Sequence, residues 1–149
     1  MNESHRFNGK TAIVTGGAGG IGTAICQRLA REGAFVVVTD TNEENAHKVA
    51  TDITASGGSA IAIPADISSE SACKDLISQT FELRGQIDVL VNNAGIMRRG
   101  NILDISVEDW NDLFAVNITA MFHLCRAALP HMIVGGGGAI VNTASQWGL

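Results

Sequence analysis

The chain of 149 residues contains no tyrosine, no long apolar run and few charged side chains, which make up 17% of it. Its formal net charge of −5 offers no basic patch to a phosphate backbone, which argues against nucleic acid as a partner. The longest strongly apolar stretch, AFVVV, is far shorter than the ~20 residues that span a bilayer, and the opening segment MNESHRFNGK lacks the apolar region of a signal peptide. We therefore expect a cytoplasmic protein without a membrane partner.

Cysteine and histidine are also scarce. The three cysteines, Cys26, Cys73 and Cys125, are odd in number and widely spaced, which argues against a disulfide framework or a zinc knuckle. The four histidines show neither ligand spacing nor an acidic partner. We predict no metal site, and we expect the cysteines to be small buried side chains.

Apolar residues and glycine, by contrast, are abundant. Hydrophobic residues make up 46% of the chain, which is ample for a core, and there are 17 glycines where the usual ~7% predicts about 10. Buried strands and tight backbone turns produce such a bias. The length fits one domain, so residues 1–149 are expected to form a single unit.

Apolar runs of strand length alternate with stretches of helical period along the whole chain. The runs cover residues 11–15, 35–39, 60–63, 87–92 and 138–143. Because they are apolar on both faces, they favour a parallel sheet that is covered by helices on each side. We predict an α/β fold with a Rossmann-type, doubly wound parallel sheet in the strand order 3-2-1-4-5, which places the fifth strand at an edge.

Two helices carry start signals. Thr41 and Glu44 form a capping-box pattern ahead of a buried stripe that contains Ala46, Val49, Ala50 and Ile53. Ser106 and Asp109 open a later helix in the same way. The face expected for that helix, which Pro130 is predicted to end, contains Trp110, Phe114, Asn117, Met121 and Cys125.

The segment TGGAGGIG, residues 15–22, lies between the first strand and the first helix, where a helix N-terminus presents free N–H groups to an anion. From spacing alone, two glycine frames remain open. Gly17, Gly19 and Gly22 give G-x-G-x-x-G, whereas Gly16, Gly20 and Gly22 give G-x-x-x-G-x-G. Asp40 ends the second strand, where a carboxylate can accept hydrogen bonds from a ribose 2′-OH. The combination predicts a dinucleotide-binding domain.

Asp40 also bears on the choice of cofactor. A carboxylate at this position accepts ribose hydroxyls and repels a 2′-phosphate. No lysine or arginine lies within the glycine loop or the following DTNEEN segment to offset that repulsion. We therefore predict NAD(H) rather than NADP(H).

Together these residues resemble the short-chain dehydrogenase/reductase family, in its compact single-domain form that includes 3-oxoacyl-carrier-protein reductases and sugar dehydrogenases. TGGAGGIG is similar to the family motif T-G-x-x-x-G-x-G, which selects the second frame and assigns cofactor contacts to Gly16, Gly20, Ile21 and Gly22. NNAG, residues 92–95, resembles the motif that ends the family's fourth strand and assigns Asn93, Ala94 and Gly95 to the cofactor site. Asp66 and Ile67 resemble the pair that contacts adenine.

The resemblance implies two catalytic positions. Asn117 is expected to anchor a water in a proton relay, and Ser145 to hold the oxygen of a small-molecule substrate while a secondary alcohol and a ketone interconvert. Both have physical support, because Asn117 interrupts an apolar helical face and Ser145 follows a parallel strand at its carboxyl end. A satisfied core asparagine and an ordinary loop serine are the alternative interpretations.

The family's Y-x-x-x-K motif is expected near positions 158 and 162, beyond Leu149. The resemblance therefore indicates a chain truncated before the proton-donating tyrosine, and we expect these residues alone to lack turnover. A non-catalytic NAD-binding module complete at residue 149 is the main alternative, and another Rossmann-type enzyme such as a methyltransferase or flavoprotein is a third. An apolar edge strand and an unpartnered helix favour a homo-oligomer over a well-behaved monomer.

Overall fold

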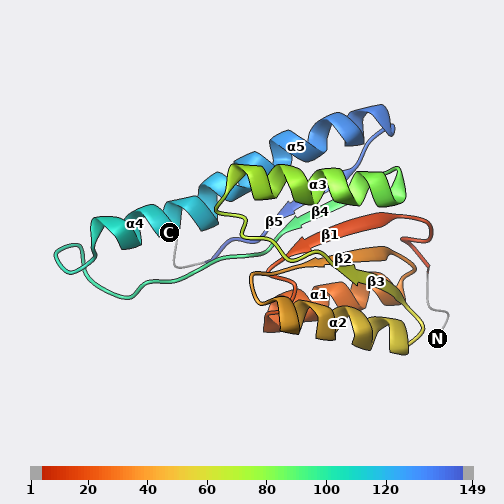
Figure 1. The fold of residues 1–149 in the computed structure, drawn as a ribbon, viewed down its shortest axis with the longest axis horizontal. Coiled ribbons are helices and arrows are strands. Elements are labelled where there is room, and N and C mark those ends of the chain that lie inside the picture. Colours follow the sequence, from red (N-terminus) through yellow and green to blue (C-terminus); the bar gives the residue numbers. More distant parts are fainter. Residues whose placement is uncertain (1–4, 146–149) are drawn as a thin grey trace.

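The computed structural model describes residues 5–145, which form strands and helices in alternation (Figure 1). In chain order the elements are β1 (Thr11–Thr15), α1 (Gly20–Arg31), β2 (Phe35–Thr39), α2 (Glu43–Ala55), β3 (Ser59–Ala62), α3 (Glu70–Arg84), β4 (Val89–Asn92), α4 (Val107–Phe114), the π-helix η1 (Ala115–Thr119), α5 (Ala120–Val134) and β5 (Ala139–Asn142).

The five strands form one parallel sheet in the order β3-β2-β1-β4-β5. The predicted fold class and strand order are thus confirmed. The first two strands have the predicted bounds, whereas the other three differ from the prediction by one or two residues at their ends. Such differences are expected where an apolar run continues past the last ladder hydrogen bond.

Helices cover both faces of the sheet (Figure 1). Alternate residues of one strand pack against the two helix layers. On β1, Ala12 and Val14 pack into the core shared with α1 and α2, while Ile13 packs into the core shared with α3 and α5. All three side chains are fully buried. The period of two in a strand therefore explains why the three central residues of β1 are all apolar.

The helix caps agree with the sequence in one case and differ in the other. Ser106 caps α4, because its hydroxyl accepts a hydrogen bond from the Asp109 N–H at 3.0 Å, as predicted. The predicted Thr41–Glu44 capping box is wrong: Asn42 is the N-cap of α2 and accepts from the Asn45 N–H at 2.9 Å. Asp40 explains the shift, since its carboxylate accepts the Asn42 N–H at 3.1 Å and holds that residue in extended backbone.

The helical stretch Val107–Val134 contains a π turn in its middle and does not end at Pro130, contrary to the prediction. A π turn adds one residue, which rotates the following helix by about 100°. The predicted face is wrong on both sides of this turn. Before it, Trp110 and Phe114 are exposed. After it, the rotation makes Ala120, Leu124, Ala128 and Met132 the buried positions of α5. Met132, beyond the proline, packs into the core, which favours continuation of the helix.

By length and composition, this 28-residue stretch is also long and apolar enough to cross a membrane. The sequence expectation missed this property because polar residues interrupt the apolar ones. A single helix of this kind is weak evidence for a membrane span, and 17% of its most apolar window is buried. α5 lies beside α3 (Figure 1), and its buried residues pack into the core that the two helices share.

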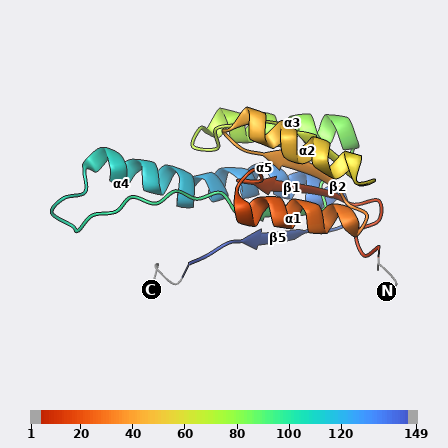
Figure 2. The same ribbon diagram turned by 90° about the horizontal axis from the view of Figure 1, so that it is seen from below.

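Strand β5 lies at the edge of the sheet (Figure 2). Ile140 is half-buried against the core, whereas Val141 is 52% exposed. The expectation of a strand covered on both faces is wrong for β5, although its predicted edge position is confirmed. The reason is tertiary, because α1 and α2 cover the strands nearer the other edge and do not extend to β5.

Candidate nucleotide-binding site

A groove of about 160 Å³ opens at the carboxyl ends of the strands. The segments that follow β1, β2, β3 and β4 line it, together with η1. Its wall includes six of the residues predicted from sequence to bind the cofactor. These six are Gly16, Asp40, Asp66, Ile67, Ala94 and Gly95, and the remaining lining residues are Thr39, Thr41, Ala65, Ile96 and Val116.

The glycine loop is shaped by two close approaches. Gly16 has φ = 61°, a conformation that side chains disfavour, and a Cβ there would lie 2.8 Å from the Ala94 Cα. At Gly22 a Cβ would lie 2.0 Å from the Gly16 carbonyl oxygen. Glycine is thus required at both positions, because the first turn of α1 packs directly on the loop.

The loop leaves free donors at the start of α1. Gly17, Ala18 and Gly19 donate their N–H groups to protein oxygens. The next two groups, at Gly20 and Ile21, meet no acceptor among residues 5–145, and Gly19 as N-cap has no side chain to supply one. Gly20 also faces open space, since a Cβ there would meet nothing within 4 Å. An anion can approach this helix end closely.

Asp40 ends β2 beside the glycine loop. Its Oδ2 accepts the Ala18 N–H at 3.1 Å, and its backbone carbonyl accepts the Ala65 N–H at 3.2 Å. The aspartate is half-buried in the groove wall. One residue therefore orients both the glycine loop and the loop that carries Asp66 and Ile67.

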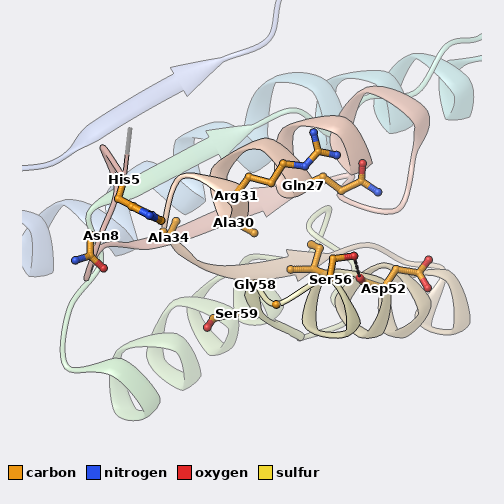
Figure 3. Close-up of a pocket in the computed structure, with 13 residues that line it drawn as sticks. His5, Asn8, Gln27, Ala30, Arg31, Ala34, Asp52, Ser56, Gly58 and Ser59 are labelled. Carbon is orange, nitrogen blue, oxygen red and sulfur yellow. Dashed lines mark hydrogen bonds between the residues drawn. The ribbon is translucent and has the colours of Figure 1, made fainter. Parts of the chain in front are cut away.

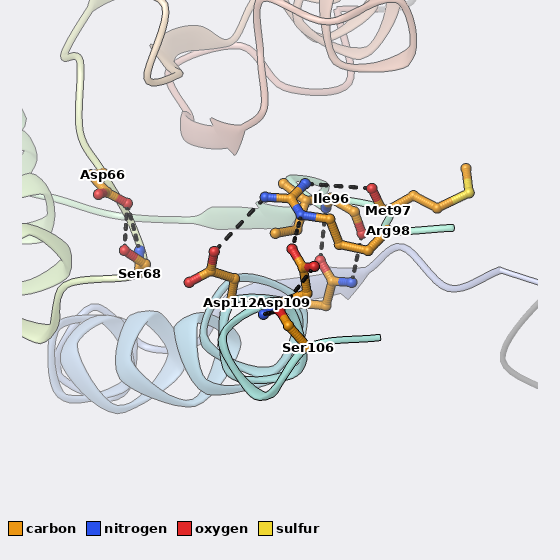
Figure 4. A network of polar contacts seen from close by, with 9 residues as sticks. Asp66, Ser68, Ile96, Met97, Arg98, Ser106, Asp109 and Asp112 are labelled. Atoms are coloured by element: carbon orange, nitrogen blue, oxygen red, sulfur yellow. Dashed lines mark hydrogen bonds and ion pairs between the residues drawn. The ribbon is translucent and has the colours of Figure 1, made fainter. Parts of the chain in front are cut away.

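Asp66 and Ile67 follow β3. Asp66 Oδ1 accepts from the N–H and the hydroxyl of Ser68, at 3.0 and 2.7 Å (Figure 4). Both of these hydrogen bonds fall on Oδ1, so Oδ2 has acceptor capacity left. Ile67 is buried and accepts a hydrogen bond from the Cys73 thiol on its carbonyl oxygen, at 3.2 Å.

Asn93 lies behind the glycine loop and contacts its backbone. Its Nδ2 donates to the carbonyl oxygens of Thr15 and Gly16, at 3.1 and 3.3 Å. In return, the buried Thr15 hydroxyl accepts the N–H groups of Asn93 and Ala94, both at 3.1 Å. Sequence reasoning missed Thr15 as a structural partner, although its place at the carboxyl end of β1, first in TGGAGGIG, was a usable signal.

Asn117 lies in η1, and its side chain is satisfied by one backbone position. Asn117 Oδ1 accepts the Ile96 N–H at 2.8 Å, and Nδ2 donates to the Ile96 carbonyl at 2.9 Å. The amide therefore clamps the segment after NNAG to the helix. π turns occur frequently at functional sites, and here one carries the polar residue next to the groove.

Ser145 lies three residues beyond β5 and is exposed. Two contacts hold the chain before it: the Thr143 N–H donates to the Asn92 carbonyl at 3.0 Å, and Asn92 Nδ2 donates to Asn142 Oδ1 at 2.8 Å. The Thr143 hydroxyl also approaches Asn93 Oδ1, at 3.5 Å. The segment that leads from β5 to Ser145 is thus held by the NNAG motif, which also contacts the glycine loop.

The cysteines differ in burial. Cys26 and Cys73 are fully buried, and burial raises the pKa of the Cys26 thiol to about 12 and that of Cys73 to about 11. Such thiols carry almost no thiolate at neutral pH. Cys125 is half-buried and free. Over the part of the chain that the structure describes, no three His, Cys, Asp or Glu side chains are grouped to hold a metal ion.

A larger cavity, of about 620 Å³, lies at the other end of the strands, between the C-terminal halves of α1 and α2 (Figure 3). Two of its polar lining residues, Asp52 and Ser56, have partners within α2. Asp52 Oδ2 accepts from Lys48 at 2.9 Å, and Ser56 Oγ donates to the Asp52 carbonyl at 2.8 Å. Helices end at this side of the sheet, so the cavity lacks the free N–H groups found at the groove.

The model of the short chain dehydrogenase family matches residues 10–149. The chain is 40% identical over 146 residues to 2,5-dichloro-2,5-cyclohexadiene-1,4-diol dehydrogenase of Sphingobium indicum, which covers 98% of this chain and 58% of that protein. It is 38% identical to D-threitol dehydrogenase of Mycolicibacterium smegmatis, over 95% of this chain and 54% of that protein. It is 36% identical to 3-oxoacyl-[acyl-carrier-protein] reductase of Chlamydia pneumoniae, over 92% of this chain and 55% of that protein.

Among solved structures, a metagenomic short-chain oxidoreductase in complex with NADP matches with a TM-score of 0.90 and 37% sequence identity, over 93% of this chain and 63% of that one. The fold, the glycine loop and these matches agree: the chain belongs to the short-chain dehydrogenase/reductase family. It spans about half the length of the curated relatives it matches. The named relatives are dehydrogenases and reductases, so the family is one of oxidoreductases.

Proposed function

We propose that the chain is the dinucleotide-binding domain, residues 1–149, of an NAD(H)-dependent oxidoreductase that interconverts a secondary alcohol and a ketone. The observation that carries the proposal is the groove itself. Its wall contains Gly16 and the Asp40 carboxylate, and the glycine loop that begins at Gly16 leads to two free N–H groups at the start of α1. A bound nicotinamide dinucleotide would supply the hydride acceptor or donor for this chemistry.

The residues present fit a dinucleotide. A pyrophosphate suits the exposed Gly20 and Ile21 N–H groups, where the helix dipole adds favourable charge. Asp40 has acceptor capacity left for ribose hydroxyls, because each carboxylate oxygen takes one backbone N–H at 3.1 Å and can accept a second bond. The buried Ile67 and the half-buried Asp40 and Ala94 form a partly apolar wall for a base and a sugar.

Asp40 supports NAD(H) over NADP(H), since a carboxylate at the ribose site repels a 2′-phosphate. The metagenomic relative was solved with NADP, so both cofactors occur in this family. Among residues 5–145, the groove wall contains Asp40 and Asp66 and no cationic side chain. A second phosphate in this groove would therefore face uncompensated negative charge.

We assign roles to the remaining predicted residues in the same way. Asn93, Ala94 and Gly95 shape the groove from the β4 side, and Asn117 fixes the Ile96 backbone that continues this wall. Ser145 is assigned to hold the substrate oxygen. Its place beyond the carboxyl end of β5 supports this role, because ligands of open α/β sheets bind at that end.

Two wider expectations also belong to the proposal. The net charge of −5 favours small molecules over nucleic acid as partners. A cytoplasmic location is proposed from the short apolar stretches of the sequence and the polar opening segment. The exposed apolar residues of the α4 to α5 stretch, Val107, Trp110, Phe114, Ile118 and Phe122, recur on one side of it and favour a homo-oligomer.

A titration of the protein with NADH and with NADPH tests the proposal. Binding is measured by quenching of the fluorescence of the two tryptophans, Trp110 and Trp147. We expect NADH to bind at least tenfold more tightly, as a difference of about 1.5 kcal/mol per charged hydrogen bond implies. Equal affinities contradict the NAD(H) assignment. Absence of binding by either cofactor contradicts the proposed function and favours another role for the groove.

A further inference from the structure

Arg98 joins the loop after β4 to the first turns of α4. Its Nε donates to Asp109 Oδ1 at 2.9 Å, and its Nη2 lies 3.8 Å from Asp112 Oδ2 (Figure 4). Asp109 is itself held in place, because its Oδ2 accepts the Ser106 hydroxyl at 3.1 Å within the helix cap. The guanidinium therefore contacts two acids whose positions are set by the start of a helix.

Two residues earlier, the same loop is attached to the helical stretch at a second point. Asn117 accepts from the Ile96 N–H and donates to the Ile96 carbonyl. Ile96 lines the nucleotide groove. Residues 96–98 are thus held against α4 and η1 from both ends, by an amide clamp at Ile96 and an ion pair at Arg98.

Little else holds this part of the loop. Among the described residues, no backbone-to-backbone hydrogen bond involves residues 96–100, and the next such bonds begin at Asn101. The Met97 side chain does not pack against the domain, since it is 66% exposed. The position of the Ile96 wall therefore depends on the two attachments.

We propose that Arg98 is a positioning residue for the dinucleotide groove, acting through the Ile96 backbone that it helps to hold against α4. The effect of Arg98 on cofactor binding rests on the proposed function, whereas its effect on the Ile96 backbone does not. Arg98 forms ion pairs with Asp109 and Asp112, so we do not assign an anionic substrate to it. The neighbouring Arg99 is exposed and makes no ion pair with any residue in the described part of the chain, which makes it a matched control.

The first test measures the attachment without any cofactor. Hydrogen exchange of the Ile96 amide is followed by mass spectrometry with residue-level fragmentation, in the unmutated protein and in R98A, R98K, R99A and N117A. We expect R98A to accelerate exchange about two- to fivefold, the range for a partly exposed ion pair. R99A should leave exchange unchanged, R98K should remain within about twofold of the unmutated protein, and N117A should exchange fastest because it removes the acceptor.

The second test measures the consequence for the groove. R98A should weaken NADH binding about two- to fivefold at an unchanged melting temperature, with R99A unaffected. A lowered melting temperature with unchanged NADH affinity overturns the positioning role and leaves an ordinary surface ion pair. Unchanged Ile96 exchange in R98A overturns it as well, whether or not NADH binds. Accelerated exchange in a protein that binds no dinucleotide supports the positioning role and contradicts the proposed function instead.

Discussion

The Asp40 carboxylate accepts the backbone N–H of Ala18 at 3.1 Å, and this contact ties the end of β2 to the glycine loop across the mouth of the groove. The two residues lie 22 positions apart in the sequence. One side chain therefore serves both the shape of the loop and the charge of the site. Its two contributions can be separated by substitution.

Asp40→Ala should weaken NADH binding about tenfold to a hundredfold, because charged hydrogen bonds of ~1.5–3 kcal/mol are lost. Asp40→Asn keeps an acceptor for the Ala18 N–H but removes the charge, so it should chiefly relax discrimination against NADPH. Titrations of both variants with both cofactors measure the two effects. If Asp40→Asn leaves the NADH to NADPH ratio unchanged, the carboxylate charge does not select the cofactor.

Gly20→Ala and Gly22→Ala should separate folding from binding. At Gly22 a Cβ lies 2.0 Å from the Gly16 carbonyl oxygen, so alanine must displace the loop and lower the melting temperature. At Gly20 a Cβ meets nothing within 4 Å, so the fold should keep its stability. The same methyl group lies beside the free N–H groups and should hinder a pyrophosphate. Calorimetry with NADH titration checks this, and equal melting temperatures for the two variants contradict it.

Glu32 should make stability depend on pH in the acid range. Hydrogen bonds from Arg6 and then Arg28 lower the pKa of this carboxyl from 4.5 to about 2, against the opposing effect of burial. Because the folded pKa lies below the unfolded one, the stabilisation is present above pH 4.5 and is lost as pH falls towards 2. Urea unfolding of Glu32→Gln should show a weaker acid dependence than the unmutated protein and the exposed-site control Glu82→Gln. Identical slopes contradict this.

The isolated 149 residues should not behave as a stable monomer. β5 is an edge strand in which Val141 is 52% exposed. In α4, Trp110 is 49% exposed and Phe114 is 45% exposed. Unpaired strand edges and contiguous apolar surface favour association. Light scattering at several protein concentrations measures this, and a soluble monomer at all of them contradicts the expectation.

These residues alone should also show no turnover. Hydride transfer to a ketone leaves an alkoxide that needs a proton, and the chain has no tyrosine to donate it. General acid–base catalysis is worth about 10²–10⁴ in rate, and a poorly held substrate loses more. The assay follows reduced-cofactor absorbance at roughly 340 nm with a panel of ketones and secondary alcohols. Turnover above background contradicts the prediction, whereas activity gained on extension through a Y-x-x-x-K segment supports it.

The sequence alone was sufficient for the order of elements, the strand order and the glycine loop. These features have local signatures: apolar runs of strand length, helical period, and glycines next to an acid at the end of a strand. β1 shows this well, because its central residues are apolar on both faces and all five of its positions are buried.

Tertiary structure decided the contacts between segments that are distant in the chain. The Thr15 hydroxyl meets the Asn93 N–H 78 residues away, and Arg98 reaches α4 across an irregular loop, neither of which has a local pattern. The π turn at Asn117 shifted the buried face of the following helix α5 to Ala120 and Leu124, because one extra residue in a turn changes every position after it. Such outcomes depend on which surfaces pack together, and packing is a property of the folded chain rather than of any one segment.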